Sequence, residues 1–370
     1  MKKIIIFLLS VFIFVPLTSI LVFATDVHYD EEYFTENLFS NIDSETLSVL
    51  EEFGINDLSS AEIFSVSISD ITKYFSESLS ERMNFCVQFF IQLLSLVFIN
   101  AIVKSYFNFN SKDNLINIIG IVSTALIIVS KLNSLINMLL SSISSCGAFM
   151  LGFIPVYTVL ISLCGSPAAA IAYNSLTFAF AQGISGFINN VFIKLTGAYF
   201  CLSLSFCINE NMNVNRLINI VNKLVNFIIG FFACGFTGIL SVKGITSSAV
   251  DAVSAKSIKF LLSSLIPIVG SSISDAYSSL LGSISLIKSS VAIVGILVVL
   301  IISLPAIIEA SVYCLMLSFI SYICEVLESD SISSAVRVFY CGLKYIVMLN
   351  VFEVFILIIS VGIMLTVKGV

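Results

Sequence analysis

The run SVAIVGILVVLIISLPAII, residues 290–308, carries no charged side chain. A helix needs about 20 mostly apolar residues to cross the hydrocarbon core of a bilayer, so this run is typical of a membrane-spanning helix. Similar runs cover 84–103, 115–130, 135–163, 168–193, 195–208, 225–242, 310–327 and 345–367. Because some of these runs are short or long for one crossing, we predict about seven or eight spans. The expected fold is an all-α, polytopic α-helical membrane bundle.

The composition supports a membrane protein. Of the 370 residues, 58% are hydrophobic and only 11% are charged, whereas soluble domains carry about 25% charged residues. The net charge of −6 is unevenly distributed, because residues 25–83 have a net charge of −12 and residues 84–370 a net charge of +4. This distribution indicates an acidic segment in water followed by a body in lipid, with no surface suited to nucleic acid.

The first 24 residues, MKKIIIFLLSVFIFVPLTSILVFA, follow a signal-peptide pattern. Lys2 and Lys3 precede an apolar run, and small residues at its end predict cleavage after Ala24. The alternative is an uncleaved anchor helix. Under either interpretation the acidic segment 25–83 is expected to be helical and extracytoplasmic.

The stretch SAVDAVSAKSIKF, residues 248–260, has a different pattern. At 100° per residue, Val250, Val253 and Phe260 share one helical face, whereas Asp251 and Lys259 share the other. This pattern predicts an amphipathic helix. The following LIPIVG, residues 265–270, predicts a turn before a second, serine-rich helix.

Segment 243–289 is therefore too polar for a simple span, and we expect it to lie at the membrane interface or to dip into it. Irregular backbone in lipid requires protein or a water-filled cavity around it, so this segment is the predicted pore lining or partner surface. The candidate residues are Asp251, Lys256, Lys259, Pro267, Gly270, Asp275 and Lys288. The predicted divisions are 1–24, 25–83, 84–242, 243–289 and 290–370.

Basic residues give only part of the topology. Lys104 and Lys112, and later Arg216 and Lys223, suit the cytoplasmic side if the acidic segment is outside. By the number of predicted spans between them, the bases of segment 243–289 and the bases Arg337 and Lys344 cannot all be on the cytoplasmic side unless one segment is re-entrant. The topology after residue 243 stays open on these grounds.

The sequence predicts no enzyme. The one histidine, His28, lies in the acidic segment, and the chain lacks HExxH, GxGD and P-loop motifs. The nine cysteines lie in or beside apolar runs without CxxC spacing, which is typical of small buried side chains and not of a metal site. We expect no cofactor and no metal.

Two polar residues lie within the run 345–367. Glu353 follows Asn350 by three residues, and a charge at this depth usually faces a cavity or a partner. A neutral carboxyl hydrogen-bonded inside the bundle is the alternative. Glu309, four residues after Pro305, is predicted to mark a turn between two spans.

Residues 231–295 resemble the stage III sporulation protein AE family of endospore-forming bacteria. The matching features, in chain order, are Gly238, Ser241-Val242-x-Gly244, Ser248-Ala249-Val250, Ala255-Lys256, Lys259-Phe260, Ile266-Pro267-x-Val269-Gly270, Asp275-Ala276, Lys288, Val291 and Gly295. More loosely, Pro155, the turn Gly165-Ser166-Pro167 and the order of the spans are also similar.

The resemblance implies a multi-pass subunit of a channel or secretion-like complex in the mother-cell membrane around the forespore, needed for late forespore gene expression. Implied partners are the other stage III A sporulation proteins, including a secretion-type ATPase and ring-forming proteins, with the lipid bilayer and further copies of the chain. The alternative expectation is a stand-alone secondary transporter that uses the carboxylate of Glu353.

Overall fold

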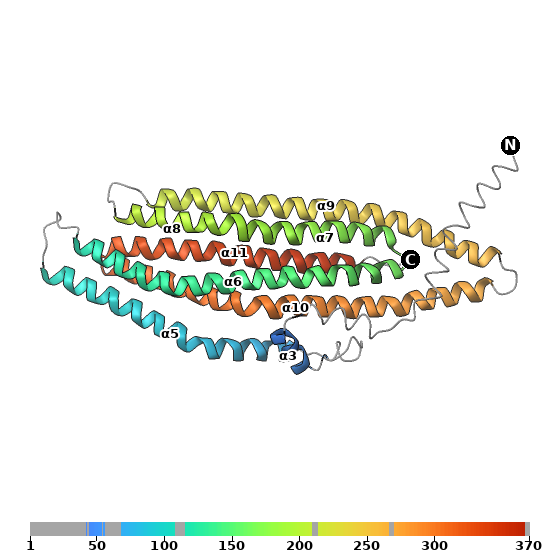
Figure 1. The fold of residues 1–370 in the computed structure, drawn as a ribbon, viewed down its shortest axis with the longest axis horizontal. Helices are drawn as coiled ribbons and strands as arrows, with labels where there is room; N and C mark the ends of the chain where they lie inside the picture. The colour runs from blue at the N-terminus through green and yellow to red at the C-terminus, as the bar shows by residue number, and fades with distance from the viewer. Residues whose placement is uncertain are drawn as a thin grey trace.

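The computed structural model describes residues 42, 44–53, 55, 68–107, 115–208, 214–265 and 270–366. Cleavage after Ala24 and most of the acidic segment lie outside these residues. Within them every regular element is a helix, in the order α3 (Ser44–Glu52), α5 (Ile68–Phe107), α6 (Leu115–Leu163), α7 (Pro167–Phe187), η1 (Ile188–Phe192), α8 (Ile193–Ile208), α9 (Val214–Leu265), α10 (Gly270–Val326) and α11 (Asp330–Thr366). Figure 1 shows them as a long bundle, with α9 along one edge and α5 along the opposite edge.

Six helices of the described chain are long and apolar enough to cross a membrane, fewer than the predicted seven or eight. The difference arises because three pairs of predicted runs are continuous. Runs 115–130 and 135–163 form the single helix α6, and runs 290–308 and 310–327 both lie in α10. The π-helical turn η1 joins α7 to α8 without a break.

Proline inside these helices does not end them. Pro155 lies within α6 and Pro305 within α10. Proline removes one backbone donor, but neighbouring helices satisfy the freed groups in a membrane bundle. The prediction that Glu309 marks a turn is therefore wrong. Glu309 lies inside α10, where it is 8% exposed.

The long helices align into two tiers along the bundle. We call the first the apolar tier; it comprises 135–163 of α6, 168–193 of α7, η1 and α8, 225–242 of α9, 290–308 of α10 and 345–366 of α11. We call the second the basic tier; it comprises 84–107 of α5, 115–134 of α6, 194–208 of α8, 214–224 of α9, 309–326 of α10 and 330–344 of α11.

Side-chain contacts hold the apolar tier in register. The Asn350 side chain donates a hydrogen bond from Nδ2 to the Leu139 carbonyl oxygen at 3.0 Å, which ties α11 to α6. Cys146 Sγ and Ser303 Oγ lie 3.0 Å apart between α6 and α10, and the rings of Phe180 and Phe236 lie 4.8 Å apart between α7 and α9. Glu353 is the one charged residue in the ranges that define this tier.

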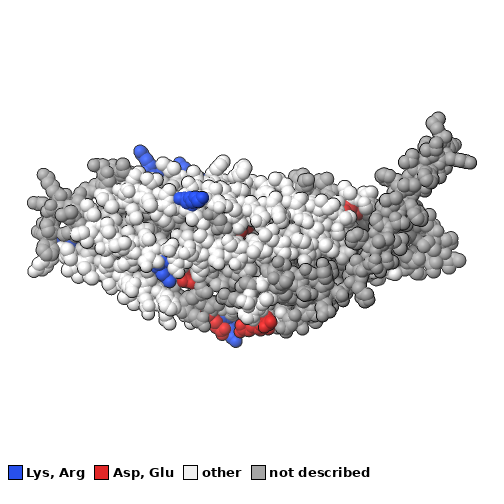
Figure 2. Space-filling view, in the orientation of Figure 1, with Lys and Arg blue, Asp and Glu red and all other residues white. Residues whose placement is uncertain are grey.

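Different contacts hold the basic tier in register. Tyr199 donates to the Val338 carbonyl oxygen at 3.3 Å, and the Lys131 ammonium lies 5.3 Å from the Tyr313 ring centroid. Lys104 donates to the Glu328 carbonyl oxygen at 2.6 Å, which ties the end of α5 to the turn between α10 and α11. Seven bases lie in this tier: Lys104, Lys131, Lys194, Arg216, Lys223, Arg337 and Lys344. In Figure 2 most Lys and Arg side chains on the visible face gather in the left half of the bundle.

The bundle is longer than a bilayer is thick. The 49 residues of α6 extend over roughly 74 Å, whereas the hydrocarbon core is about 30 Å thick. Both tiers nevertheless expose large apolar side chains, for example Phe231 in the apolar tier and Phe319 in the basic tier. One bilayer is therefore too thin to cover the full length of α6.

Beyond the apolar tier, α9 and α10 continue as a helical hairpin that we call the tip hairpin, residues 243–265 and 270–289. Figure 1 shows this hairpin extending past the ends of α6, α7 and α11. The two helices predicted in segment 243–289 are thus extensions of α9 and α10. The predicted turn at Pro267 lies outside the described residues.

Candidate functional site

Polar residues line one face of α11 within the apolar tier. Asn350, Glu353 and Ser360 are separated by three and seven residues, a spacing that places them on the same helical face. Ser360 Oγ lies 2.8 Å from Thr177 Oγ1 of α7, and Asn350 bonds to α6. This face therefore points into the bundle between α6 and α7.

Glu353 is buried in this interior. Its side chain is 2% exposed, and Oε1 has no hydrogen-bond partner among the described residues. An ionised carboxylate without a partner is costly in a low-dielectric interior. The alternative prediction is a neutral carboxyl hydrogen-bonded inside the bundle, and Oε1 makes no such hydrogen bond to the described residues. The carboxyl is chemically suited to take up a proton or a cation.

Asp251 accepts hydrogen bonds from the backbone at the start of α7 and is not a free surface charge. Ala168 N and Ala169 N donate to its Oδ1 and Oδ2 at 3.0 and 2.9 Å. These are two of the unpaired donors at the start of α7, where the adjoining Ser166 side chain makes no capping bond. The carboxylate also faces the positive end of the helix dipole. Asp251 therefore caps α7 from another helix and fixes α9 to the turn between α6 and α7.

Lys288 packs near the same turn. Its side chain is 2% exposed and lies close enough to Cys164 for an electrostatic interaction. Tyr157 and Tyr173 pack edge to face nearby along α6 and α7, with ring centroids 5.6 Å apart and both hydroxyl oxygens without a hydrogen-bond partner in the described chain. The base of the tip hairpin is thus anchored around buried polar groups.

The predicted surface residues of segment 243–289 therefore separate into groups. Asp251 and Lys288 are buried within the chain, whereas Lys256 and Asp275 are exposed on the tip hairpin. The side chains of Lys259 and Gly270, and all of Pro267, lie outside the described residues. Of the four described side chains, Asp251 and Lys288 lie beside the α6–α7 turn, whereas Lys256 and Asp275 are exposed on the hairpin.

The predicted amphipathic helix is oriented with its apolar face outward. Val250, Val253 and Phe260 are 55%, 67% and 68% exposed, whereas Asp251 on the polar face is 4% exposed. A helix on a water-soluble protein normally buries its apolar face. This inverted arrangement leaves an apolar surface on α9 that begins level with the start of α7 and continues toward the end of α9.

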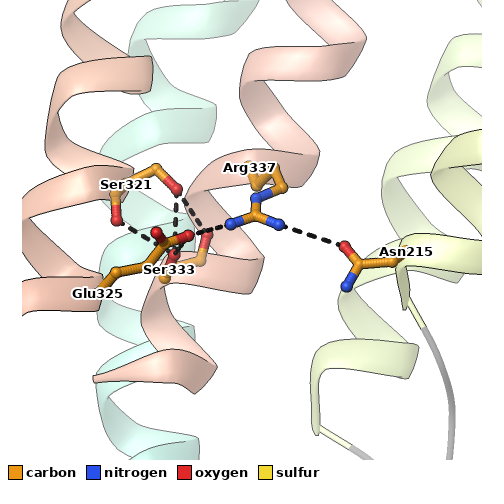
Figure 3. Close-up of polar contacts among 5 residues, drawn as sticks. All are labelled: Asn215, Ser321, Glu325, Ser333 and Arg337. Atoms are coloured by element: carbon orange, nitrogen blue, oxygen red, sulfur yellow. Dashed lines mark hydrogen bonds and ion pairs between the residues drawn. The ribbon is translucent and has the colours of Figure 1, made fainter. Parts of the chain in front are cut away.

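A polar cluster in the basic tier was not predicted. Figure 3 shows Arg337 between Glu325, with which it forms an ion pair, and Asn215, to which it donates at 3.4 Å. Ser333 donates to Glu325 at 3.4 Å and lies 3.0 Å from Ser321. The cluster links α9, α10 and α11. In the sequence, the signal that could have predicted it is the pair of opposite charges, Glu325 and Arg337, on either side of the short turn between α10 and α11.

The cysteines are mostly buried, as their positions predict. Seven of the nine are buried, but Cys201 and Cys234 are exposed. Within the described residues no group of three or more His, Cys, Asp or Glu side chains is arranged to hold a metal ion.

Comparison with known proteins gives one family. The model of the family described as stage III sporulation protein AE matches residues 54–368. The stage III sporulation protein AE of Bacillus subtilis (strain 168) is 26% identical over 186 residues, which cover 49% of this chain and 46% of that relative. No solved structure matches the chain. Since the family match includes both tiers and the tip hairpin, this chain belongs to the stage III sporulation protein AE family.

Proposed function

We propose that this chain is a multi-pass membrane subunit of a sporulation-specific channel or secretion-like complex between mother cell and forespore. It has no enzymatic activity of its own in this proposal. It sits in the mother-cell membrane around the forespore, acts with the other stage III A sporulation proteins, including a secretion-type ATPase and ring-forming proteins, and is needed for late forespore gene expression. Family membership supports the sporulation role.

The inverted helix of the tip hairpin is the observation that carries the subunit role. Val253 and Phe260 are 67% and 68% exposed and lie beyond Asp251, which contacts the start of α7 at the end of the apolar tier. A bilayer around that tier does not reach the tip of the hairpin. Apolar surfaces of this kind outside lipid mark contacts with protein. A subunit of an assembly covers this surface, whereas an isolated transporter does not.

The positions of the bases favour one orientation. Lys104, Arg216 and Arg337 lie near the end of α5, the α8–α9 connection and the α10–α11 turn, which all meet at the basic end of the bundle. Under the positive-inside rule this end is cytoplasmic, and the tip hairpin is extracytoplasmic. Because α9, α10 and α11 are continuous helices, Arg337 and segment 243–289 lie at opposite ends of the bundle, so in this orientation the bases of segment 243–289 are extracytoplasmic.

Deletion of the gene in its spore-forming host tests the proposal. We expect loss of late forespore reporter expression and of heat-resistant spores, with recovery when the wild-type chain is supplied in the mother cell. Supply in the forespore alone is the matched control and should not restore either readout. Normal sporulation after deletion would refute the proposed function.

Glu353 favours a second candidate, a secondary transporter coupled to proton or cation movement. Its buried carboxyl lies in the apolar tier with Oε1 unpartnered in the described chain. Liposomes that contain only this protein would then take up a solute, and Glu353→Gln would abolish uptake. Asp275→Asn, which changes an exposed carboxylate, is the control and should leave uptake unchanged.

A further inference from the structure

The tip hairpin has two outward faces that differ in side-chain size. On α9, Val250, Val253 and Phe260 recur at intervals of three and seven residues and are all more than half exposed. Such spacing places them in one row, as in the seam of a helix pair. We call this row the large face.

The outward face of α10 carries small side chains instead. Ser279, Gly282 and Ser283 are exposed, with Asp275 and Leu286 at the two ends of the same row. No atom lies within 4 Å of the position where a Cβ on Gly282 would be. Small residues let a neighbouring helix approach closely, so this row, which we call the small face, is suited to receive larger side chains.

The two faces lie at matching distances from the turn. Val253 is 12 residues before the end of α9 at Leu265, and Gly282 is 12 residues after the start of α10 at Gly270. Copies of a membrane protein are inserted with one orientation. The large face of one copy and the small face of a neighbour are therefore at the same height above the membrane.

The faces are also complementary in charge. Lys256 is exposed beside the large face, and Asp275 is exposed on the small face. Neither is paired with an opposite charge within the described part of the chain. Lys256 and Asp275 differ in height by four residues, roughly 6 Å along a helix, which is within the reach of a lysine side chain.

We propose that the tip hairpins join neighbouring copies of this chain, with the large face of α9 in one copy packed on the small face of α10 in the next. A contact between two different faces is heterologous, and in this proposal the rotation between neighbours, which share one orientation in the membrane, closes the copies into a ring. Val253 fills the space over Gly282, and Lys256 pairs with Asp275. The ring lies at the α6–α7 turn and beyond it, at the tip-hairpin end of the apolar tier.

Disulfide trapping tests the contact directly. The full chain, with exposed Cys201 and Cys234 changed to serine, carries Val253→Cys together with Gly282→Cys and is expressed alone in a host that does not sporulate. Oxidation of isolated membranes should give a ladder of covalent multimers, because each copy bonds to a different neighbour on each side. The pair Phe227→Cys with Gly282→Cys is the matched control; Phe227 is exposed but lies in the apolar tier, so no ladder is expected.

The single variants distinguish the kind of contact. Val253→Cys alone and Gly282→Cys alone should stay monomeric, and co-expression of the two should give dimers but no longer multimers. A dimer of Val253→Cys with itself, the absence of any multimer, or a crosslink only to another protein would each overturn the proposal.

Charge exchange adds a second test. Lys256→Glu or Asp275→Lys alone should lower the yield of the ladder roughly two- to five-fold, as expected for an exposed ion pair. The double variant should restore the yield, which a contact with a different protein would not do. Because these experiments need no sporulating cell, failure of the ring and failure of the proposed function give different results.

Discussion

The two tiers both expose apolar side chains, but they differ in where their polar groups lie. In the apolar tier Asn350, Glu353 and Ser360 all point into the bundle. In the basic tier seven Lys and Arg residues accompany exposed apolar side chains such as Phe319. A charged group costs most at the centre of the hydrocarbon, so we infer that the bilayer surrounds the apolar tier.

Arginine on the outer surface gives the largest expected contrast. Phe231 and Phe319 are 66% and 59% exposed, in the apolar and basic tiers respectively. Phe231→Arg should cost about 2.5–3.5 kcal/mol of insertion free energy, whereas Phe319→Arg should cost less than about 1 kcal/mol because it lies outside the hydrocarbon. Insertion efficiency in isolated membranes, read by glycosylation tags on either side of the helix, measures both.

Conservative changes control for loss of packing, since Phe231→Leu and Phe319→Leu should both insert normally. Equal costs for the two arginine variants would break the distinction between the tiers. A larger cost at Phe319 would place the bilayer around the basic tier instead.

Inside the bundle the tiers should behave alike. A methyl group added to Gly295 would overlap the Phe153 ring in the apolar tier, and one added to Gly342 would overlap the Phe200 ring in the basic tier. Overpacking of this kind costs about 1–3 kcal/mol, so each alanine variant should lower the thermal stability of the purified protein in detergent. Gly235 is the control because it faces open space; Gly235→Ala should be neutral or stabilising. A tolerated Gly342→Ala would show that the basic tier is more loosely packed.

The sequence predicted the apolar segments better than it predicted their connections. Runs such as 290–308 are recognisable because charges lie only at their ends. That Pro305 and Glu309 lie within one helix depends on contacts with α5 and α6, which a local pattern does not contain. Glu353 was expected to be buried because a charge in mid-span must avoid lipid, but its neighbours on α6 and α7 are far away in the chain.

The amphipathic pattern of residues 248–260 likewise defined two faces without saying which one points inward. The answer depends on Asp251 reaching the start of α7, more than 80 residues earlier in the chain. The same pattern on a soluble helix would be oriented the other way. Only the tertiary contact reveals that the apolar face is outside.

Loss of this cap should have an intermediate effect. Asp251→Ala leaves two backbone donors of α7 without their partner, which should cost about 1–2 kcal/mol. We expect a lower melting temperature in detergent and faster thiol labelling of Cys164, which is buried beside the turn. Asp275→Ala removes an exposed carboxylate of the same hairpin and should change stability by less than about 0.5 kcal/mol. Equal effects of both variants would show that Asp251 does not anchor the hairpin.

The smallest effect is expected at the cluster of Figure 3. Arg337 and Glu325 are 39% and 40% exposed, and ion pairs with this much solvent contribute about 0–1 kcal/mol. Glu325→Gln should therefore lower stability by at most this amount, and the loss should shrink at high salt because exposed charges are screened. Arg337→Lys retains the positive charge but loses the fork that contacts both Glu325 and Asn215, so it separates charge from geometry. A salt-independent loss above about 2 kcal/mol would instead indicate that this end of the basic tier is shielded from water, as it would be if the bilayer reached it.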